Sequence, residues 1–339
     1  MKKTKVVCIG EALIDRIKNK TNQGFTDFLG GAPANVVCAL RKLQIDSSFI
    51  GRIGSDEFGK KFIKQFKELE VNINFLQLDD CLPTRIVKVN RDNSGDRYFS
   101  GFDTSLNTFF ADEAFDKNEI KKDLISLENL FSKTRYLVCG TIILSSSISA
   151  DSINFLLSLA NKFDVKIIID LNWREVFWDF STSSSETSKK ERVDLIRNLL
   201  NKAHILKLAK EEAILFFENE NPLEISERLL NRPDVIITDG ENPIVWLING
   251  VQGTTEVLKS LKIIDTTGAG DAFLAGLISQ LLSFDYPSNE SEIQNCVKFA
   301  SICVGYSPVL VKVRLNNNQT IQRLINFLDP KFYNFSQNL

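Results

Sequence analysis

The sequence has one histidine, no closely spaced pair of cysteines, no long hydrophobic run and no excess of charge of either sign. The single histidine, His204, lies in the apolar segment AHILKL, which reads as a buried strand, so we expect a structural role for it. None of the six cysteines forms a Cys-x-x-Cys pair, which argues against the usual zinc motifs. Most lie within apolar runs, as expected of buried thiols in a reducing compartment.

The charge balance and hydropathy exclude further classes of protein. With 41 Lys and Arg against 43 Asp and Glu, the chain has a net charge of −2 and supplies no basic field for nucleic acid or an anionic membrane. The apolar stretch 272–279 ends at Gln280 and is too short to span a bilayer. The N-terminal segment MKKTKVVCIG lacks a cleavage site, so we expect no export signal and a cytoplasmic location.

Short apolar strands alternate with amphipathic helices along the chain. This alternation predicts an α/β fold with a mostly parallel sheet covered by helices on both faces, and residues 1–335 are predicted to form a single domain. The predicted strands are 5–10, 47–54, 135–141, 165–172, 204–209, 234–240 and 243–248. The predicted helices are 34–44, 58–71, 151–163, 190–202, 210–217, 223–231, 271–283 and 289–305.

One region interrupts the alternation. Residues 82–103 show period-two hydrophobicity around a turn at Asp92–Gly95, which indicates an antiparallel hairpin apart from the main sheet. Residues 11–29 are candidates for further strands of this small sheet. Such a sheet can form a lid over an active site, whereas a plain edge hairpin is the alternative.

The segment IIDTTGAGDAFLAGL, residues 263–277, is the most informative for chemistry. A strand is predicted to end at Asp265, and the turn Gly268-Ala269-Gly270 then leads into a helix starting at Asp271. Bare main-chain N–H groups and a helix N-terminus can together stabilise a phosphoryl group. A carboxylate at that point can accept a proton from an attacking hydroxyl.

Three other interpretations of this segment are testable by inspection. A dinucleotide-binding fingerprint requires a third glycine where the chain has Phe273, and a Walker P-loop requires Gly-Lys after the turn, where Asp271 follows Gly270. Both of these interpretations fail. An ordinary helix N-cap is the remaining alternative, but it needs neither three small residues nor the preceding Thr-Thr pair.

A second segment, LGGAPANV at 29–36, places two glycines before a helix. Gly30 and Gly31 would admit a ligand close to the backbone, and Asn35 offers a donor and an acceptor suited to sugar hydroxyls. Asp15 is either a solvated turn acid or an acceptor for two hydroxyls. Each signal alone is weak.

Together these motifs resemble the ribokinase family, the PfkB-type carbohydrate kinases. GGAPAN at 30–35 and DTTGAGDAF at 265–273 are similar to its two signatures. GRIGSDEFG at 51–59, DLNWR at 170–174, KLAKEE at 207–212 and TDG at 238–240 agree in order and spacing. GEALID and PTR at 83–85 point to the fructokinase branch. The resemblance implies a ribokinase-like three-layer α/β/α fold with a projecting lid, whose strands would be inserted at about 11–29 and 82–103.

The resemblance also implies an activity and a set of site residues. The activity would be transfer of the γ-phosphate of ATP to a primary hydroxyl of a small sugar, fructose first, with Mg²⁺ and a K⁺-type cation. Asp271 would be the base and Gly268, Ala269 and Gly270 the anion hole, with Arg174 stabilising charge. The other implied roles are the sugar site, the nucleotide site and the metal sites: Asp15, Gly30, Gly31, Asn35 and Asn172 for the sugar; Lys207, Thr238 and Gly240 for the nucleotide; Glu212 for Mg²⁺ through water; and Asp265 and Thr267 for the monovalent cation.

Several positions depart from the family pattern. Ala209 stands where Asn or Ser is common, Pro243 replaces a loop glycine, and Asp103 lies where fructokinases carry an arginine. Ser307-Pro308-Val309-Leu310 replaces a small-residue run near the adenine. Another acceptor (ribose, 2-keto-3-deoxygluconate or a nucleoside) and a non-catalytic fructokinase-like interaction protein are therefore the alternatives. Since a projecting sheet often pairs with its twin, a homodimer through the lid is one arrangement to test.

Overall fold

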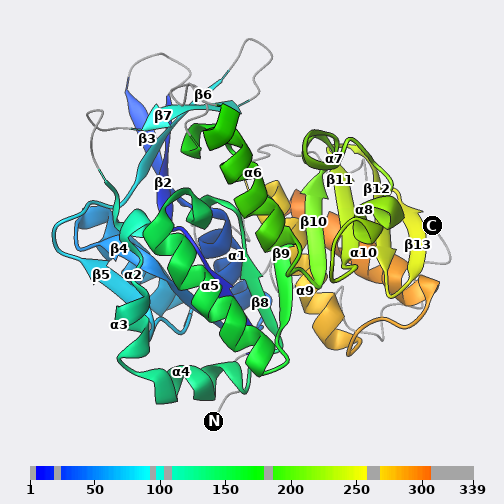
Figure 1. The fold of residues 1–339 in the computed structure, drawn as a ribbon, viewed down its shortest axis with the longest axis horizontal. Coiled ribbons are helices and arrows are strands. Elements are labelled where there is room, and N and C mark those ends of the chain that lie inside the picture. Colours follow the sequence, from blue (N-terminus) through cyan, green and yellow to red (C-terminus); the bar gives the residue numbers. More distant parts are fainter. Residues whose placement is uncertain are drawn as a thin grey trace.

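The computed structural model describes residues 5–18, 24–91, 97–102, 109–178, 186–257 and 268–306. Within these residues, no helix is long and apolar enough to cross a membrane. The chain forms one large and one small β-sheet, with helices packed around the large one (Figure 1).

The large sheet has nine strands in the order β13-β12-β11-β10-β9-β8-β1-β4-β5. Neighbours from β5 to β11 run parallel, whereas β12 and β13 add an antiparallel edge. The strands are β1 (Val6–Ile9), β4 (Ser47–Gly54), β5 (Leu76–Asp79), β8 (Tyr136–Cys139), β9 (Lys166–Asp170), β10 (Ile205–Ala209), β11 (Asp234–Asp239), β12 (Asn242–Ile248) and β13 (Val251–Thr255). The predicted mostly parallel sheet is confirmed.

Helices cover both faces of this sheet because its strands are apolar on both sides. In β1, Val6 and Cys8 pack into one core and Val7 and Ile9 into the other. The first core contains α1 (Ala32–Lys42), α2 (Glu57–Glu68), α9 (Ala269–Ser283) and α10 (Glu290–Gly305). The second contains α3 (Lys117–Lys121), α4 (Leu124–Phe131), α5 (Ser147–Lys162), α6 (Glu186–Leu200), α7 (Lys210–Phe217) and α8 (Pro222–Glu227). The three-layer α/β/α prediction is confirmed.

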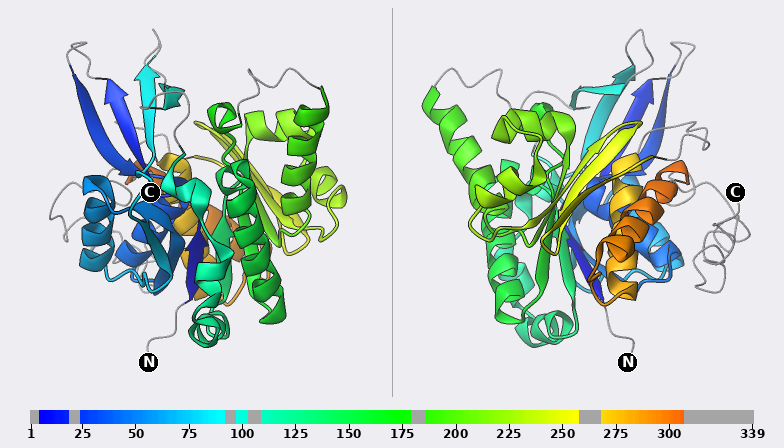
Figure 2. Two further views of the ribbon diagram at one scale, coloured as in Figure 1. Left: turned by 60° about the vertical axis from the view of Figure 1, so that its left-hand side comes forward. Right: turned by 90° about the vertical axis from the view of Figure 1, so that its right-hand side faces the viewer.

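The small sheet projects from one end of the large sheet (Figure 2). Its order is β3-β2-β6-β7, formed by β2 (Leu13–Lys18), β3 (Phe25–Gly30), β6 (Ile86–Arg91) and β7 (Arg97–Phe102). The pairs β2–β3 and β6–β7 are antiparallel, and β2 pairs with β6 in parallel. The predicted hairpin and the extra strands at 11–29 are confirmed, whereas the turn Asp92–Gly95 lies outside the described residues.

Some local details differ from the prediction. Helices α3 and α4 and strands β5 and β13 were not predicted. Helix α9 begins at Ala269 rather than Asp271, so Asp271 lies inside its first turn. Pro243 lies in β12 at an irregularity in its pairing with β11, where a missing N–H is tolerated. The predicted strand ending at Asp265 falls outside the described residues.

Candidate active site

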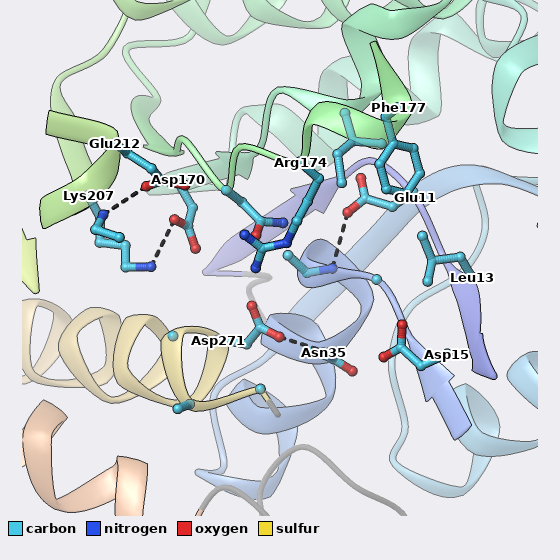
Figure 3. A pocket seen from close by; sticks show the side chains of 18 of the residues that line it. Glu11, Leu13, Asp15, Asn35, Asp170, Arg174, Phe177, Lys207, Glu212 and Asp271 are labelled. Carbon is cyan, nitrogen blue, oxygen red and sulfur yellow. Dashed lines mark hydrogen bonds and ion pairs between the residues drawn. The ribbon is translucent and has the colours of Figure 1, made fainter. Parts of the chain in front are cut away.

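A cavity of about 680 Å³ lies where strands β9, β10 and β11 end, beside the small sheet and the first turns of α1 and α9 (Figure 3). This is the edge at which open α/β sheets bind ligands. The cavity brings together most of the predicted site residues: Asp15, Gly31, Asn35, Asn172, Arg174, Lys207, Glu212, Thr238, Gly268, Ala269, Gly270 and Asp271.

Four predicted residues are not among the lining. Gly30 lies directly behind Asp15, since a Cβ at Gly30 would come within 2.6 Å of Asp15 Oδ2. Gly240 follows β11 and has open space around it. Asp265 and Thr267, predicted for the monovalent cation, lie outside the described residues.

Asp271 lies at the start of α9, directly after the small-residue turn. Gly268 caps the helix in the left-handed conformation, with a φ of 76° that favours glycine. The amide Nδ2 of Asn35 donates a hydrogen bond of 2.8 Å to Asp271 Oδ2. The pKa of Asp271 is raised from 3.8 to about 6, chiefly by burial and also by nearby Asp170, against the opposing effects of Asn35, Lys207 and Arg174. The carboxylate is thus ionised at neutral pH yet more basic than an exposed aspartate.

The side of the cavity formed by the small sheet and α1 contains a carboxyl group, that of Glu11, to which the sequence analysis gave no role. Glu11 Oε1 accepts a hydrogen bond of 3.1 Å from the main-chain N–H of Ala32, the first residue of α1. Gly31, the residue before Ala32, has a φ of 94°, and a Cβ on Gly31 would lie 2.5 Å from the main-chain carbonyl oxygen of Glu11. Burial raises the pKa of Glu11 to about 8, so this carboxyl is protonated at neutral pH. Its signal in the sequence was the GEALID motif.

The opposite side of the cavity carries an ion pair between adjacent strands. Lys207 on β10 lies in register with Asp170 on β9, and its Nζ donates to Asp170 Oδ1 at 3.0 Å. Burial lowers the pKa of Lys207, but Asp170 and Glu212 outweigh this effect, so the pKa is raised overall. A Cβ at Gly270 would come within 2.9 Å of Nζ, so the ammonium group lies against the small-residue turn. Asp170 is a second lining residue without a predicted role.

Glu212 connects the ends of β9 and β10. Its Oε1 accepts from the N–H of Trp173 at 2.6 Å and its Oε2 from the N–H of Ala209 at 2.7 Å. Burial raises the pKa of Glu212. Because each oxygen already accepts a main-chain hydrogen bond, this carboxylate is better placed to hold a metal ion through a water molecule than to coordinate one directly. Among the residues that the structure describes, no group of three or more His, Cys, Asp or Glu side chains could hold a metal ion.

The turn after β9 presents two further polar residues. Asn172 adopts a φ of 42°, a left-handed conformation that is uncommon outside glycine and concentrates at functional sites. Arg174 Nη1 donates to the carbonyl of Trp173 at 2.8 Å. Thr238 Oγ1, at the end of β11, donates to the carbonyl of Leu208 at 3.3 Å. These three side chains border the same cavity as Asp271.

The rest of the lining is largely apolar and was not predicted. Leu13, Ile17, Val89, Ile142 and Phe177 line the cavity together with Ala32, Ala209 and Glu211. Their spacing carried no distinctive signal, because the tertiary fold alone brings them together. His204 lies elsewhere, where its Nδ1 accepts from the N–H of Ile167 at 3.1 Å, in agreement with the structural role predicted for it.

A helix N-terminus, an ammonium group and a basic carboxylate around one cavity suit phosphoryl transfer to a hydroxyl group. The family model "pfkB family carbohydrate kinase" matches residues 3–305, and the chain belongs to this family. The chain is 29% identical over 320 residues to "Probable fructokinase-6, chloroplastic" of Arabidopsis thaliana, covering 91% of this chain and 78% of that one.

Solved structures agree with this assignment. The apo form of the fructokinase of Vibrio cholerae O395 is 25% identical, with a TM-score of 0.71 over 91% of this chain and 99% of that one. The form of that protein with fructose, ADP and calcium ion bound has a TM-score of 0.75 at 23% identity, over 96% and 99% of the two chains. The predicted family, ribokinase-like fold and activity class are confirmed: the protein is a carbohydrate kinase.

Proposed function

We propose that this kinase is a fructokinase, which transfers the γ-phosphate of ATP to a primary hydroxyl of fructose. The observation that carries the proposal is the position of Asp271. Its carboxylate lies beside the turn Gly268-Ala269-Gly270 and is bonded to Asn35 from the acceptor side. The relatives named as fructokinases support fructose as the acceptor.

In the proposed reaction, Asp271 removes the proton of the sugar hydroxyl as its oxygen attacks the γ-phosphorus. The bond to the bridging oxygen breaks, leaving ADP and the sugar phosphate, and Asp271 later releases the proton to solvent. Main-chain N–H groups of the turn and the N-terminus of α9 stabilise the charge on the transferred group. Arg174 and Lys207, both lining the cavity, add positive charge.

The remaining roles follow the two sides of the cavity. Asp15 and Asn35 hold the sugar hydroxyls, Gly30 and Gly31 leave room for them, and Asn172 lies between the two substrates. Thr238 and Gly240 border the nucleotide. Glu212 would hold Mg²⁺ through a water molecule, and that ion would neutralise phosphate charge; Asp265 and Thr267, outside the described residues, would hold a K⁺-type cation.

We propose that residues 1–335 form one domain with the small sheet as its lid, and that the protein is cytoplasmic. Five of the six cysteines are buried and free, as in a reducing compartment. Phe25 on β3 is 54% exposed, so the small sheet offers an apolar side chain at which a second copy can pack.

The test is ADP release from ATP and Mg²⁺, with K⁺ present, against fructose, ribose, 2-keto-3-deoxygluconate and adenosine. We expect release with fructose and none from folded D271N. Release with another acceptor alone would reject fructose but keep the kinase chemistry. Silence across the panel, together with no binding of ATP by calorimetry, would favour the non-catalytic interaction protein.

A further inference from the structure

Arg85 is buried in a cage of aromatic rings at the base of the small sheet. Its side chain is 3% exposed, and the guanidinium carbon lies 5.2 Å from the ring centre of Phe102, 4.8 Å from that of Phe110 and 5.1 Å from that of Phe177. Phe102 ends β7, whereas Phe177 belongs to the short 3₁₀ turn Glu175–Phe177. One side chain therefore contacts both the small sheet and the segment that follows Arg174.

Two carboxylates compensate the charge of this guanidinium. Arg85 Nε donates to Asp112 at 2.9 Å, and Nη2 lies 3.4 Å from an oxygen of Glu113. Cation–π contact and a paired carboxylate both require the planar guanidinium in one orientation. An apolar side chain would fill the space without fixing the angles between the rings. The cage thus sets the orientation of β7 relative to the segment of Phe177.

Thr84, the residue directly before Arg85, anchors this cage to the large sheet. The main-chain N–H and the hydroxyl of Thr84 both donate to the Asp56 carboxylate, at 2.7 and 2.9 Å. The N–H of Gly54 donates to Thr84 Oγ1 at 3.1 Å. A Cβ at Gly59 would lie 1.8 Å from the carbonyl oxygen of Gly54, so this packing needs glycine. Gly54, Asp56 and Gly59, three residues of the motif at 51–59, therefore hold Thr84 of the PTR motif in place.

The cage also adjoins the acceptor side of the cavity. Phe177 lines the cavity (Figure 3). Its ring packs edge-on against that of Phe102, with ring centres 5.3 Å apart. The carbonyl of Arg85 accepts a hydrogen bond of 2.8 Å from the N–H of Ile14, next to Asp15 on β2. Arg85 thereby contacts, through its side chain and its main chain, the two segments that border the sugar.

We propose that Arg85 is a positioning residue that sets the acceptor pocket by fixing Phe177 and the small sheet relative to Asp15. The inference rests on the proposed sugar kinase function. It predicts that loss of the guanidinium weakens binding of the sugar and leaves binding of the nucleotide unchanged, because Lys207 and Thr238 lie outside the cage.

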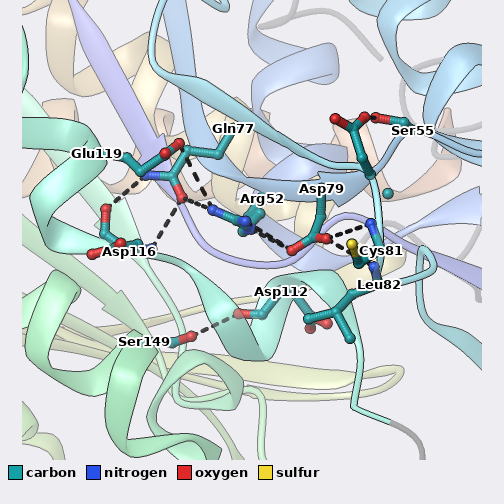
Figure 4. A network of polar contacts seen from close by, with 12 residues as sticks. Arg52, Ser55, Gln77, Asp79, Cys81, Leu82, Asp112, Asp116, Glu119 and Ser149 are labelled. Carbon is teal, nitrogen blue, oxygen red and sulfur yellow. Dashed lines mark hydrogen bonds and ion pairs between the residues drawn. The ribbon is translucent and has the colours of Figure 1, made fainter.

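Arg52 provides a matched control. It too is a largely buried arginine, 16% exposed, and it bonds to Asp79 at 2.9 Å and to Gln77 at 3.0 Å (Figure 4). Asp79 in turn accepts N–H bonds from Cys81 and Leu82 at the start of the segment that leads to Arg85. Arg52 does not line the cavity. The R52M variant therefore loses a comparable ion pair without altering the pocket wall.

The experiment measures KM for fructose, KM for ATP and kcat in R85K, R85M, F177L, R85M/F177L and R52M, with the thermal midpoint of each. We expect R85K and R85M to raise KM for fructose about tenfold, with KM for ATP within about twofold of the wild type. R85K keeps the charge, so it tests the planar contacts should R85M fail to fold. In R85M/F177L the increase in KM should be less than the product of the single effects, because the two residues share one contact.

The outcomes separate this inference from the proposed function. Silence of the wild type across the sugar panel would overturn both. An active wild type with unchanged KM for fructose in the folded Arg85 variants would overturn the inference alone. So would an equal rise in KM for ATP, or an equal rise in KM for fructose in R52M.

Discussion

The side-chain amide of Asn35 and the carboxylate of Asp271 are joined by a hydrogen bond of 2.8 Å across 236 positions in the sequence. The bond links the first turn of α1 to the first turn of α9, and so connects the proposed sugar site to the proposed base. Because the amide stabilises the charged form, this bond lowers the pKa of Asp271, against the larger effect of burial.

Removal of the amide should move the pH profile of the enzyme. With a pKa of about 6, Asp271 makes kcat/KM rise as the pH increases through that value and then level off. N35L should shift this acidic limb to higher pH, so its activity relative to wild type is lowest at the acidic end of the profile and recovers partly by pH 8. Rates measured from pH 5 to 9 test this.

The variant D170N should shift the acidic limb in the opposite direction, and so it serves as a control for the direction of the pKa change. Asp170 raises the pKa of Asp271, so its neutralisation should move the acidic limb to lower pH. If N35L and D170N shifted the limb in the same direction, the electrostatic assignment of Asp271 as the titrating base would be wrong.

Replacement of Asp271 should stabilise the protein while it abolishes activity. The pKa is about 6 in the folded protein against an ordinary value of 3.8, so between these values the unfolded chain loses its proton first and stability falls as the pH rises. D271N removes this loss, which amounts to at most about 3 kcal/mol. Its gain in thermal midpoint should be larger at pH 8 than at pH 4.5. A gain that is independent of pH would contradict the argument.

The close contact at Gly30 predicts an effect confined to the sugar. A Cβ at this position would lie 2.6 Å from Asp15 Oδ2 and must displace that carboxylate. G30A should therefore raise KM for fructose by about tenfold or more, with little change in KM for ATP. The control is G250A, in the turn between β12 and β13, where a Cβ meets open space. A φ of 75° strains alanine at this position, but Gly250 does not line the cavity, so no change in either KM is expected. Equal effects in the two variants would argue against a role for Asp15.

The buried pair of Lys207 and Asp170 allows a test that separates stability from binding. K207M leaves Asp170 without its cation, which typically costs about 3–5 kcal/mol in a buried pair, and it should also weaken ATP binding. The double variant D170N/K207M should regain much of the lost stability but none of the affinity for ATP. Calorimetric titration with ATP and urea unfolding measure the two quantities. Recovery of ATP binding in the double variant would exclude direct contact between Lys207 and phosphate.

Glu212 predicts a change in magnesium dependence. A glutamine has one oxygen and one NH₂ group, so E212Q cannot accept both the Trp173 and the Ala209 N–H bonds. The turn that carries Asn172 should shift, and the Mg²⁺ concentration for half-maximal rate should rise several-fold. A chelator should abolish turnover in both proteins, and added Mg²⁺ should restore it. An unchanged Mg²⁺ requirement would remove Glu212 from the metal network.

The site residues that lie in contiguous motifs could be predicted from the sequence. The turn before α9 and the two glycines before α1 are contiguous motifs, so Asp271, Asn35 and Gly31 could be found without a structure. Glu11 and Asp170 stood in quoted motifs, but their buried contacts, to the start of α1 and to Lys207 on the neighbouring strand, form only in the folded chain. Phe177 carried no signal, because its neighbours Phe102 and Arg85 are distant in sequence.

The missed elements have a similar physical cause. Helix α3 has 5 residues, less than two turns, so hydrophobic periodicity cannot reveal it. The sequence feature that marks the start of α3 is its N-cap residue, Asp116, which accepts a hydrogen bond from the N–H of Asn118. In the same way, Asp123 caps α4 by accepting from the N–H of Ser126. The sequence analysis predicted that α9 begins at Asp271, after its true start at Ala269, because glycine and alanine give no hydrophobic periodicity. In the structure, Gly268 is the N-cap residue.

The packing of Gly54, Asp56 and Gly59 around Thr84 bears on how such chains are recognised. None of these residues borders the cavity, although they belong to one of the motifs that resemble the family. The contacts of this motif serve folding and not phosphoryl transfer, so a chain of the same fold that lacked Asp271 could keep the motif. A genome survey that searched for residues 51–59 alone would therefore select chains that share this fold. A survey that also required Asp271 would select those that keep the proposed catalytic base.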